Sequence, residues 1–382
     1  ATARWTAEAT HAGAAVRFTC NFLFMCSGYY DYAEGYTPDF AGTADFAGTI
    51  VHPQHWPADL DYAGKRVVVI GSGATAVTLV PEMAKTAAHV TMLQRSPTYV
   101  VSRPSEDAFA NWLRRWLPAM LAYGIVRWRN VLLQLWFFNF ARSRPRLVKR
   151  KLLEEVRAHL GPDYDIKTHF TPRYNPWDQR LCLVPDADLF DSIKEGRASV
   201  VTDHIDRFTE RGLLLQSGQT LEADVIVTAT GLNLLFLAGM ETTVDGRRIE
   251  FPQTFGYKGM MYSGVPNLAS SFGYTNASWT LKADLVCEYV CRLLNHMTAT
   301  GTVQCTPRLR DTDADMPQRP WIDDFSAGYM QRVMHRFPRQ GDREPWINPQ
   351  NYSRDKKMFR TGQLEDGAMQ FTTASVPASQ RA

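Results

Sequence analysis

A glycine-rich turn between two patterned segments is the first group of residues whose types and spacing could do chemistry. The apolar, β-branched run Arg66–Ile70 is typical of a buried parallel strand and precedes Gly71-Ser72-Gly73-Ala74-Thr75-Ala76. In this spacing the first glycine permits a tight turn, the second lets a pyrophosphate approach the backbone, and the small third residue lets a helix pack closely. Because the helix would present N-terminal amides to phosphates, the pattern predicts a dinucleotide site rather than a purely structural turn.

The end of the next predicted strand indicates which dinucleotide fits. His89–Gln94 is followed by Arg95 and Ser96, where an NAD site would place an acid for the ribose 2′-hydroxyl. No acid stands there, and the planar guanidinium of Arg95 can bind a 2′-phosphate through paired hydrogen bonds. We therefore expect NADP(H) at residues 71–75 with Arg95 and Ser96. The alternative is that Arg95 is a solvated loop charge.

A second set of spaced residues lies just upstream of the glycine turn. Phe46, Gly48, His52, Trp56 and Pro57 match the pattern FxGxxxHxxxWP, so the chain resembles the type I Baeyer–Villiger monooxygenases of the flavin-containing monooxygenase family. The resemblance implies that residues 46–57, the hinge segment, link an FAD domain to an NADP domain and couple their motions. It also implies that His52 acts indirectly. The patterns suggest no third ligand for a metal pair at His52, so we expect no metal site.

The active-site arginine is assigned by the resemblance alone. The similarity covers roughly residues 22–300 and is strongest to the ethionamide-activating branch, in which Trp177–Cys182 corresponds to the segment that carries this arginine. The resemblance gives the catalytic role to Arg180, whose fixed positive charge would stabilise an anionic flavin C4a-peroxide. Without it, Arg180 would be read as satisfying loop carbonyls. One departure is Gln179, where relatives often carry a basic residue aimed at the NADP 2′-phosphate.

Further segments resemble family parts that connect the domains or close over the flavin. Cys26–Tyr29 and Ala229–Gly231 resemble two connections between domains, and Gly273–Asn276 resembles the segment that closes over the flavin ring. The resemblance therefore adds Thr230, Gly231 and Asn276 to the cofactor-binding candidates. We expect none of them to be catalytic. The alternative for each is an ordinary strand–turn–strand connection.

The elements that must position these residues alternate between strand and helix patterns. Besides the βαβ unit, the sequence predicts helices over 103–159 and 281–297, and strands at 22–26, 199–202, 212–216 and 222–231. Residues 29–48 and 161–183 have loop composition. This order predicts an α/β fold. The resemblance implies a flavoprotein architecture with two dinucleotide-binding domains.

The pattern contains one dinucleotide fingerprint, whereas the family uses two. We therefore expect an N-terminally truncated chain with the FAD motif missing and the NADP motif present, which alone would neither hold FAD tightly nor oxygenate a substrate. The expected domains are 1–62 (FAD-domain remnant and hinge), 63–230 (NADP-binding, with a helical insertion at about 103–160), 231–305 (return to the FAD domain) and 306–382 (C-terminal extension). Pro307–Pro320 has linker composition, and the tail beyond Glu365 is expected to be disordered.

Composition limits the classes of partner. The net charge of +3 is too weak to indicate nucleic acid. Six cysteines without a CxxC pair favour a reduced, cytoplasmic location. Trp112–Arg142 is rich in Trp, Phe, Leu and Arg, but its uncharged runs are shorter than the roughly 20 residues of a membrane span. The segment could lie on a membrane surface, although we favour an insertion that packs on its own domain.

The resemblance implies an FAD- and NADPH-dependent monooxygenase that uses O2 to oxidise a small ketone, or to oxygenate sulfur. One alternative is the related N- or S-oxygenating class, but that class ends the hinge motif in Tyr or Phe where this chain has Trp56. Another is an NADP-binding remnant without catalysis. Neither substrate identity nor oligomeric state follows from these patterns.

Overall fold

Two compact units make up the chain. A computed structural model describes residues 2–179, 181–323 and 327–373. The first unit spans Ala1–Asp31 with Leu234–Ala382, and the second unit spans Tyr32–Asn233. The chain passes between them in β4 (Tyr30–Gly35) and β15 (Leu232–Leu234), which pair in a two-stranded sheet. The first boundary differs from the expected one after residue 62, because β5 of the hinge segment pairs with β14 in the sheet of the second unit.

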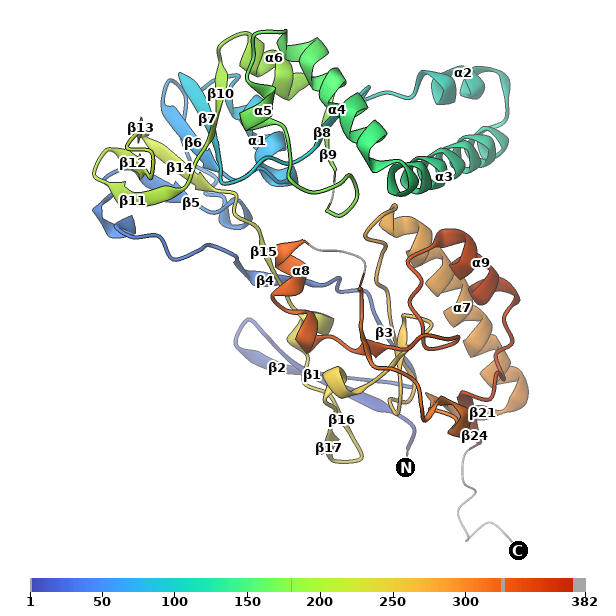
Figure 1. The fold of residues 1–382 in the computed structure, drawn as a ribbon. Helices are drawn as coiled ribbons and strands as arrows, with labels where there is room; N and C mark the ends of the chain where they lie inside the picture. Colours follow the sequence, from blue (N-terminus) through green and yellow to red (C-terminus); the bar gives the residue numbers. More distant parts are fainter. Residues whose placement is uncertain (1, 180, 324–326, 374–382) are drawn as a thin grey trace, which may run out of the picture. The chain divides into compact units, whose positions relative to one another are not determined.

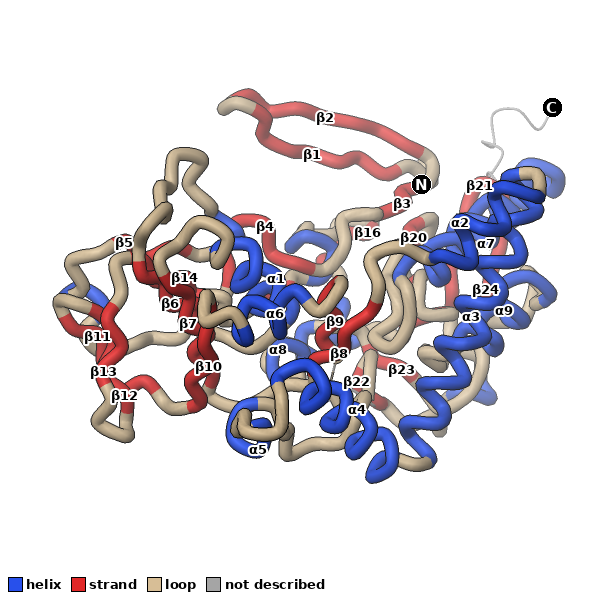
Figure 2. Tube along the Cα trace, turned by 90° about the horizontal axis from the view of Figure 1, so that it is seen from above, coloured by secondary structure: helices blue, strands red, loops and turns tan. Residues whose placement is uncertain are grey.

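The second unit is built on a five-stranded parallel sheet of order β10-β7-β6-β14-β5 (Figure 2). Its strands are β5 (Thr49–Val51), β6 (Arg66–Ile70), β7 (His89–Gln94), β10 (Ala198–Thr202) and β14 (Val225–Thr228). The central strands are buried on both faces, which explains the continuous apolar run in β6. Helix α1 (Ala74–Met83) connects β6 to β7 and contains Pro81 near its end. The α/β fold and the βαβ unit are confirmed.

A helical insertion leaves the sheet after β8 (Val100–Arg103) and returns at β9 (Cys182–Pro185), which pairs with β8. It contains α2 (Ala108–Trp116), α3 (Ala119–Ser143), α4 (Pro145–Leu160) and α5 (Ile166–His169), and α6 (Asp188–Lys194) follows. Helices α1, α4, α5 and α6 contribute buried side chains to the core around the sheet. By contrast, α2 and α3 lie away from the sheet (Figure 1). The helical prediction for 103–159 is confirmed.

A three-stranded antiparallel sheet completes the second unit. It comprises β11 (Ile205–Thr209), β12 (Gly212–Leu215) and β13 (Thr220–Glu222). Its apolar side chains share a buried cluster with Phe46 of the hinge segment and with Ile70 and Ile226 of the parallel sheet. This cluster holds the start of the hinge segment against the sheet.

The first unit combines short strands with two packed helices, α7 (Trp279–Thr300) and α9 (Tyr352–Thr361). The N-terminal strands β1 (Trp5–His11) and β2 (Ala14–Cys20) form a hairpin. The predicted strand at 22–26 is β3 (Leu23–Met25), which pairs in parallel with β20 (Leu268–Ser270). The smaller elements are β16 (Thr243–Val244), β17 (Arg247–Arg248), β18 (Gly256–Tyr257), β19 (Met261–Tyr262), β21 (Thr302–Pro307), β22 (Arg319–Pro320), α8 (Gly328–Gln331), β23 (Arg339–Gln340) and β24 (Met369–Thr373).

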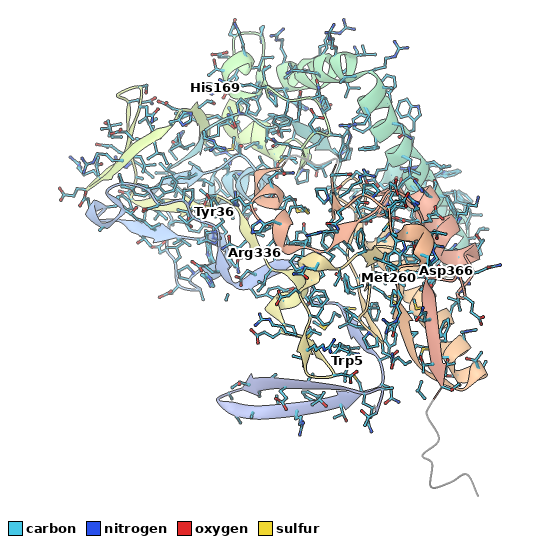
Figure 3. All side chains as sticks on the ribbon, turned by 60° about the horizontal axis from the view of Figure 1, so that its bottom comes forward. Trp5, Tyr36, His169, Met260, Arg336 and Asp366 are labelled. Atoms are coloured by element: carbon cyan, nitrogen blue, oxygen red, sulfur yellow. The ribbon has the colours of Figure 1, made fainter. Side chains whose placement is uncertain are left out.

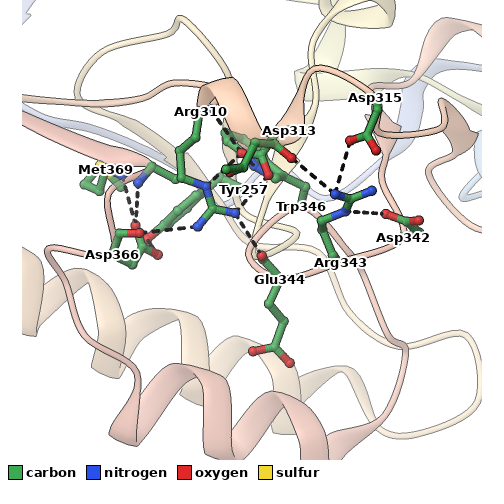
Figure 4. Close-up of polar contacts among 12 residues, drawn as sticks. Tyr257, Arg310, Asp313, Asp315, Asp342, Arg343, Glu344, Trp346, Asp366 and Met369 are labelled. Atoms are coloured by element: carbon green, nitrogen blue, oxygen red, sulfur yellow. Dashed lines mark hydrogen bonds and ion pairs between the residues drawn. The ribbon is translucent and has the colours of Figure 1, made fainter.

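The region after residue 306 is packed into the first unit, so the prediction of a linker and a disordered tail is wrong for its described residues. Strand β24 pairs with β21, and both Trp321 and Trp346 are fully buried. Polar groups here satisfy one another: Asp313 accepts hydrogen bonds from Arg310 at 2.9 Å and from the Trp346 indole at 2.8 Å (Figure 4). The polar composition of residues 307–320 is therefore that of a folded segment whose polar groups bond to one another. Within the described chain, every helix is too short or too polar to cross a membrane.

Candidate functional site

The order of the parallel sheet reverses between β6 and β14. From β6 the chain continues to β7 on one side, whereas β14 and β5 lie on the other side. Ligands of open α/β sheets bind outside the carboxyl ends of the strands at such a reversal. Ile70 at the end of β6 is level with Leu93 of β7 and with Thr228 of β14. The loops that follow these strands carry most of the predicted cofactor residues: Gly71, Ser72, Gly73, Ala74, Thr75, Arg95, Ser96, Thr230 and Gly231.

Gly71 is held between the ends of the two neighbouring strands. Its φ of +141° is one that L side chains rarely adopt, and a Cβ there would lie 2.3 Å from the carbonyl oxygen of Ala229. Its amide donates to the carbonyl of Leu93 at 2.8 Å. The tight turn that the sequence predicted therefore has a specific steric cause, which is the approach of the loop after β14.

Gly73, in contrast, faces open space. A Cβ at this position would meet no described atom within 4 Å, and its φ of −81° suits any residue. Gly73 is the N-cap of α1 and provides no side-chain hydrogen bond to the first turn, where Ala74 and Thr75 are exposed. The first-turn amides are thus presented to an open surface, as an approaching pyrophosphate requires. The residues fit a bound dinucleotide.

At the end of β7 a buried, hydrogen-bonded residue, Gln94, is followed by an exposed cation, Arg95. Gln94 is 2% exposed, and its side-chain amide donates to the carbonyl of His169 at 2.7 Å and to Thr202 at 2.9 Å. Arg95 is exposed and forms no ion pair with any carboxylate that the structure describes. The hydroxyl of Ser72 donates to the carbonyl of Ser96 at 3.1 Å, which ties the loop after β7 to the glycine turn. Arg95 is therefore a cation available beside that turn.

His169, labelled in Figure 3, supports the same corner of the sheet. Its Nδ1 lies 2.9 Å from the hydroxyl of Thr202, and burial lowers its pKa. The Thr202 hydroxyl also accepts from the side-chain amide of Gln94, which donates in addition to the backbone carbonyl of His169. Sequence reasoning missed this support, because residues 161–183 were predicted as loop, whereas His169 is the last residue of helix α5.

Arg180, the predicted catalytic residue, lies outside the described residues. The turn that precedes it is strained and firmly held. Trp177 has a φ of +72°, which is costly for a bulky residue. Arg142 of α3 donates to Asp178 at 2.8 Å, and Phe138 of α3 meets the Trp177 ring edge-on at 5.6 Å. The buried indole nitrogen of Trp177 has no hydrogen-bond partner among the described atoms.

The chain after this turn lies against the glycine turn. The thiol of Cys182 donates to the carbonyl of Ser72 at 3.8 Å, and the Cys182 amide donates to Tyr99 at 2.8 Å. Burial raises the pKa of Tyr99, whose hydroxyl donates to the carbonyl of Tyr174. Tyr174 and Cys182 are thereby each joined to Tyr99, and Cys182 is also joined to the glycine turn.

The hinge segment packs most of its motif residues into the second unit. Phe46 is buried and meets Phe208 edge-on at 6.4 Å, and Trp56 meets Tyr62 at 6.3 Å. Gly48 leaves no room for a side chain, because a Cβ would lie 2.5 Å from the carbonyl oxygen of Asp224. These residues fix the segment on the sheet, and none of them belongs to the nucleotide edge.

His52 is the motif residue that reaches the connections between the units. Its Nδ1 accepts the amide of Gln54 at 3.2 Å, so the neutral ring carries its proton on Nε2. Nε2 then donates to the carbonyl of Gly231 at 3.2 Å, beside β15. A Cβ on Gly35 would overlap the His52 ring at 1.9 Å, so the ring also packs directly on β4. His52 therefore contacts Gly35 of β4 and Gly231, the residue that precedes β15.

Thr230 and Gly231 are engaged by the same connection. The Thr230 hydroxyl donates to the carbonyl of Tyr36 at 2.6 Å, and the amide of Tyr36 donates to Gly231 at 3.0 Å. Tyr36 is labelled in Figure 3 on the segment that follows β4. Thr230 and Gly231, both predicted to bind cofactor, therefore also join the loop after β14 to the segment that follows β4.

Asn276 belongs to the first unit and is not among the residues that the second unit brings together. Its side chain donates to the carbonyl of Gln350 at 2.9 Å, and the amide of Thr275 donates to the Gln350 side chain at 2.9 Å. Lys282 and Asp355, both buried, pair at 2.8 Å behind this segment. Gln350 and Asp355 come from the region predicted as an extension, where no sequence pattern pointed to them.

The part of the chain that the structure describes contains no group of three His, Cys, Asp or Glu side chains arranged to hold a metal ion.

Comparison with protein families matches residues 1–262 to a family described as flavin-binding monooxygenase-like. The FAD-containing monooxygenase EthA of Mycobacterium tuberculosis (strain ATCC 25618 / H37Rv) is 52% identical over 375 residues, which cover 98% of this chain and 76% of the relative. EthA of Mycolicibacterium smegmatis is 48% identical over 379 residues, with the same shares of the two chains.

Two solved structures have a similar fold. An oxidised steroid monooxygenase bound to NADP superposes with a TM-score of 0.71 at 18% identity, over 98% of this chain and 78% of that one. An open structure of cyclohexanone monooxygenase gives a TM-score of 0.64 at 18% identity, over 94% of this chain and 75% of that one. At this identity the likeness concerns the fold.

Proposed function

The chain belongs to the flavin-binding monooxygenase-like family, and from this premise we propose that it is an FAD- and NADPH-dependent monooxygenase acting on a ketone or on sulfur. The observation that carries the proposal is the edge of the parallel sheet, where the glycine turn, the α1 N-terminus and Arg95 come together. FAD, when bound, accepts a hydride from NADPH and activates O2, so that one oxygen atom enters the substrate and the other leaves as water.

In this proposal the second unit holds NADPH. The amides of Gly73, Ala74 and Thr75 bind the pyrophosphate, which the open space at Gly73 allows. Arg95 and Ser96 bind the 2′-phosphate, and Arg95 has no described carboxylate to neutralise it. Arg95 would bind the 2′-phosphate without help from a second cation, because this chain has Gln179 where relatives often carry a basic residue.

Arg180 is proposed as the catalytic residue, with its guanidinium stabilising negative charge beside the flavin. Two features of the neighbouring chain support this role. The preceding turn stores strain at Trp177 and is fixed by Arg142 through Asp178, as functional turns often are. The following strand is attached to the glycine turn through Cys182. Removing the guanidinium should abolish oxygenated product while leaving NADPH binding intact.

The hinge segment is proposed to couple the two connecting strands through His52. The ring packs on Gly35 of β4 and donates to Gly231 beside β15. A shift of either strand would therefore be felt by the other through one side chain. His52 is a positioning residue in this proposal, as the resemblance implied.

As a monooxygenase the protein takes a small-molecule substrate and O2. A cytoplasmic location is part of the proposal and is supported by the six cysteines, all of them free thiols. Residues 112–142 are separately proposed to make peripheral membrane contact.

Product analysis tests the proposed function. The purified protein, supplied with FAD and NADPH, is offered a linear ketone, a dialkyl sulfide and a tertiary amine, and products are identified by mass spectrometry. Ester from the ketone or sulfoxide from the sulfide supports the proposal, and would contradict the expectation that residues 1–382 alone do not oxygenate a substrate. Formation of N-oxide alone would favour the N-oxygenating class, against which Trp56 argues. Ester formation that survives Arg180→Ala unchanged would refute the role of that residue.

A further inference from the structure

Helices α2 and α3 expose large apolar side chains at a density found nowhere else in the described chain. Of the nineteen exposed large hydrophobic residues, eleven lie between Phe109 and Trp136. Trp116 is 75% exposed, Met120 77%, Leu132 59% and Trp136 61%. An apolar surface of this size is costly in water unless something covers it.

These side chains are ordered along the helices. On α3, Leu121, Ile125, Trp128, Leu132 and Trp136 follow one another at intervals of four, three, four and four residues, so they lie on one helix face. On α2, Phe109, Trp112 and Trp116 repeat in the same way. The 25 residues of α3 bury only Ala122, Val131 and Ala141. The helix therefore contributes little to the core of its own unit.

The charges of the same region have a single sign. Between Ala108 and Leu153 the sequence has ten Lys and Arg residues and no Asp or Glu. Arg129 and Arg142 pair with carboxylates from outside this stretch. Arg114, Arg115, Arg144 and Arg146 are exposed and form no ion pair with any carboxylate in the described residues. The exposed apolar side chains are thus accompanied by unneutralised guanidinium groups.

Side-chain contacts hold helices α2 and α3 against each other. Arg129 of α3 donates to Asp107 at 2.8 Å and stacks on the Phe109 ring at 4.6 Å. Asp107 also caps α2 by accepting the amide of Ala110 at 3.1 Å. Phe109 in turn stacks on Trp112. Because these contacts hold α2 against α3, the pair presents its apolar and basic groups together.

We propose that α2 and α3 dock on the surface of a membrane that contains anionic phospholipid. Tryptophan and aliphatic side chains enter the boundary between headgroups and acyl chains, and the arginines pair with lipid phosphates. A second copy of the chain fits less well, because two surfaces with ten cations and no acid would repel each other. A nucleic acid would neutralise the charges but would leave Leu121, Leu132 and the other aliphatic groups in water.

Flotation with lipid vesicles tests this proposal and requires no turnover, so its failure is distinguishable from failure of the proposed oxygenation. The purified protein is mixed with vesicles of phosphatidylcholine alone or with added phosphatidylglycerol. We expect strong binding to the anionic vesicles, weak binding to phosphatidylcholine, and loss of binding at 1 M salt, where the screening length falls to about 3 Å.

Two variants separate the contributions to binding. Arg114→Gln with Arg115→Gln should lower the partition coefficient on anionic vesicles roughly 25-fold, at about fivefold for each arginine. Trp116→Ser with Leu132→Ser should abolish binding to anionic vesicles at low salt, where the wild-type protein binds, while the circular dichroism spectrum stays unchanged. The matched control is Phe18→Ser, because Phe18 is 66% exposed on β2 of the first unit and should not affect binding.

Three outcomes would overturn the proposal. One is equal binding to neutral and anionic vesicles, or no binding to either. Another is binding that the α2 and α3 variants leave unchanged, or that Phe18→Ser reduces equally. The last is concentration-dependent self-association that Trp116→Ser abolishes in a protein that does not bind vesicles, which would assign the surface to a second copy.

Discussion

Helices α1 and α3 belong to the same unit but relate differently to its core. Helix α1 has ten residues and buries five of them, Ala76, Val77, Val80, Pro81 and Met83. Helix α3 has 25 residues and buries three. The short helix therefore depends on the sheet beneath it, whereas the long one carries its apolar groups outward.

This difference separates two uses of apolar sequence within one unit. Around α1 the apolar residues fix a turn whose backbone geometry matters for a nucleotide, so small changes should be costly. Around α3 the apolar residues do little for folding, so single changes should leave the free energy of unfolding nearly unchanged and affect the proposed membrane binding instead. Mutations placed in pairs, one in each region, can test this contrast.

The largest expected contrast is between two glycines. Gly71→Ala should destabilise the protein by about 3 to 5 kcal/mol, because the new Cβ meets the Ala229 carbonyl at a positive φ. Gly124→Ala in α3 should stabilise it by about 0.5 to 1 kcal/mol, since the position is open and helical. Urea unfolding measures both. Equal effects at the two glycines would contradict the contrast.

The next contrast compares buried and exposed aliphatic residues. Val69→Ala in β6 removes methyl groups from a fully buried side chain and should cost about 2 kcal/mol. Leu132→Ala, at a residue that is 59% exposed, should change the free energy of unfolding by less than about 0.5 kcal/mol. A loss above about 1 kcal/mol for Leu132→Ala would mean that α3 packs on something in solution.

A buried and a partly exposed ion pair give the same kind of contrast, between Asp313–Arg310 in the first unit and Asp178–Arg142 in the second. Burial alone would raise the pKa of Asp313, yet hydrogen bonds from Arg310, the backbone and Trp346 lower it to about 2. Because the folded pKa lies below the unfolded value of 3.8, this carboxylate should contribute about 2 kcal/mol above pH 4, lost as pH falls towards 2.

Unfolding free energies measured from pH 5 down to the folded pKa of about 2 report this contribution, and Asp313→Asn should remove its part of the pH dependence. The matched control is Asp178→Asn, which removes the partly exposed pair with Arg142 and should cost less than about 1 kcal/mol. A pH dependence that Asp313→Asn leaves intact would assign it to other groups.

The smallest expected effect concerns the hinge segment. His52→Ala removes the hydrogen bond to Gly231 and should cost about 1 kcal/mol, while amide exchange at Tyr36 accelerates because its acceptor loop is loosened. His55→Ala is the control, since the exposed His55 ring places its Nε2 3.0 Å from the carbonyl oxygen of Ala33 and not at Gly231. Unchanged exchange at Tyr36 in His52→Ala would remove the coupling role.

Local patterns predicted part of this structure correctly. The bounds of β6 and β7 agree with the predicted strands, and α1 and α7 lie where helical spacing placed them. These elements were readable because each is specified by its own apolar residues and its adjacent turn. The nucleotide edge followed from them, since parallel strands bring their carboxyl ends to the same side of the sheet.

The remainder depended on partners distant in the sequence. Residues 29–48 were predicted as loop, but β4 forms there because β15 lies beside it, some two hundred residues later. Residues 307–320 were predicted as a linker, but their polar side chains bond to one another, as Arg310 and Asp313 do. Likewise, the need for glycine at position 48 arises from the approach of the Asp224 carbonyl and of the Phe46 ring, both 2.5 Å from where a Cβ would lie. No local pattern contains these contacts.

The nucleotide edge of the parallel sheet and its cation Arg95 carry the proposed binding of NADPH. The direct test is the dissociation constant of NADPH and of NADH for the wild-type chain, Arg95→Ala and the exposed control Arg211→Ala. We predict that Arg95→Ala weakens NADPH by roughly 30-fold, equivalent to about 2 kcal/mol, and leaves NADH unchanged, whereas Arg211→Ala changes neither. Equal weakening of both nucleotides by Arg95→Ala, or no change in either, would contradict the assignment of this site.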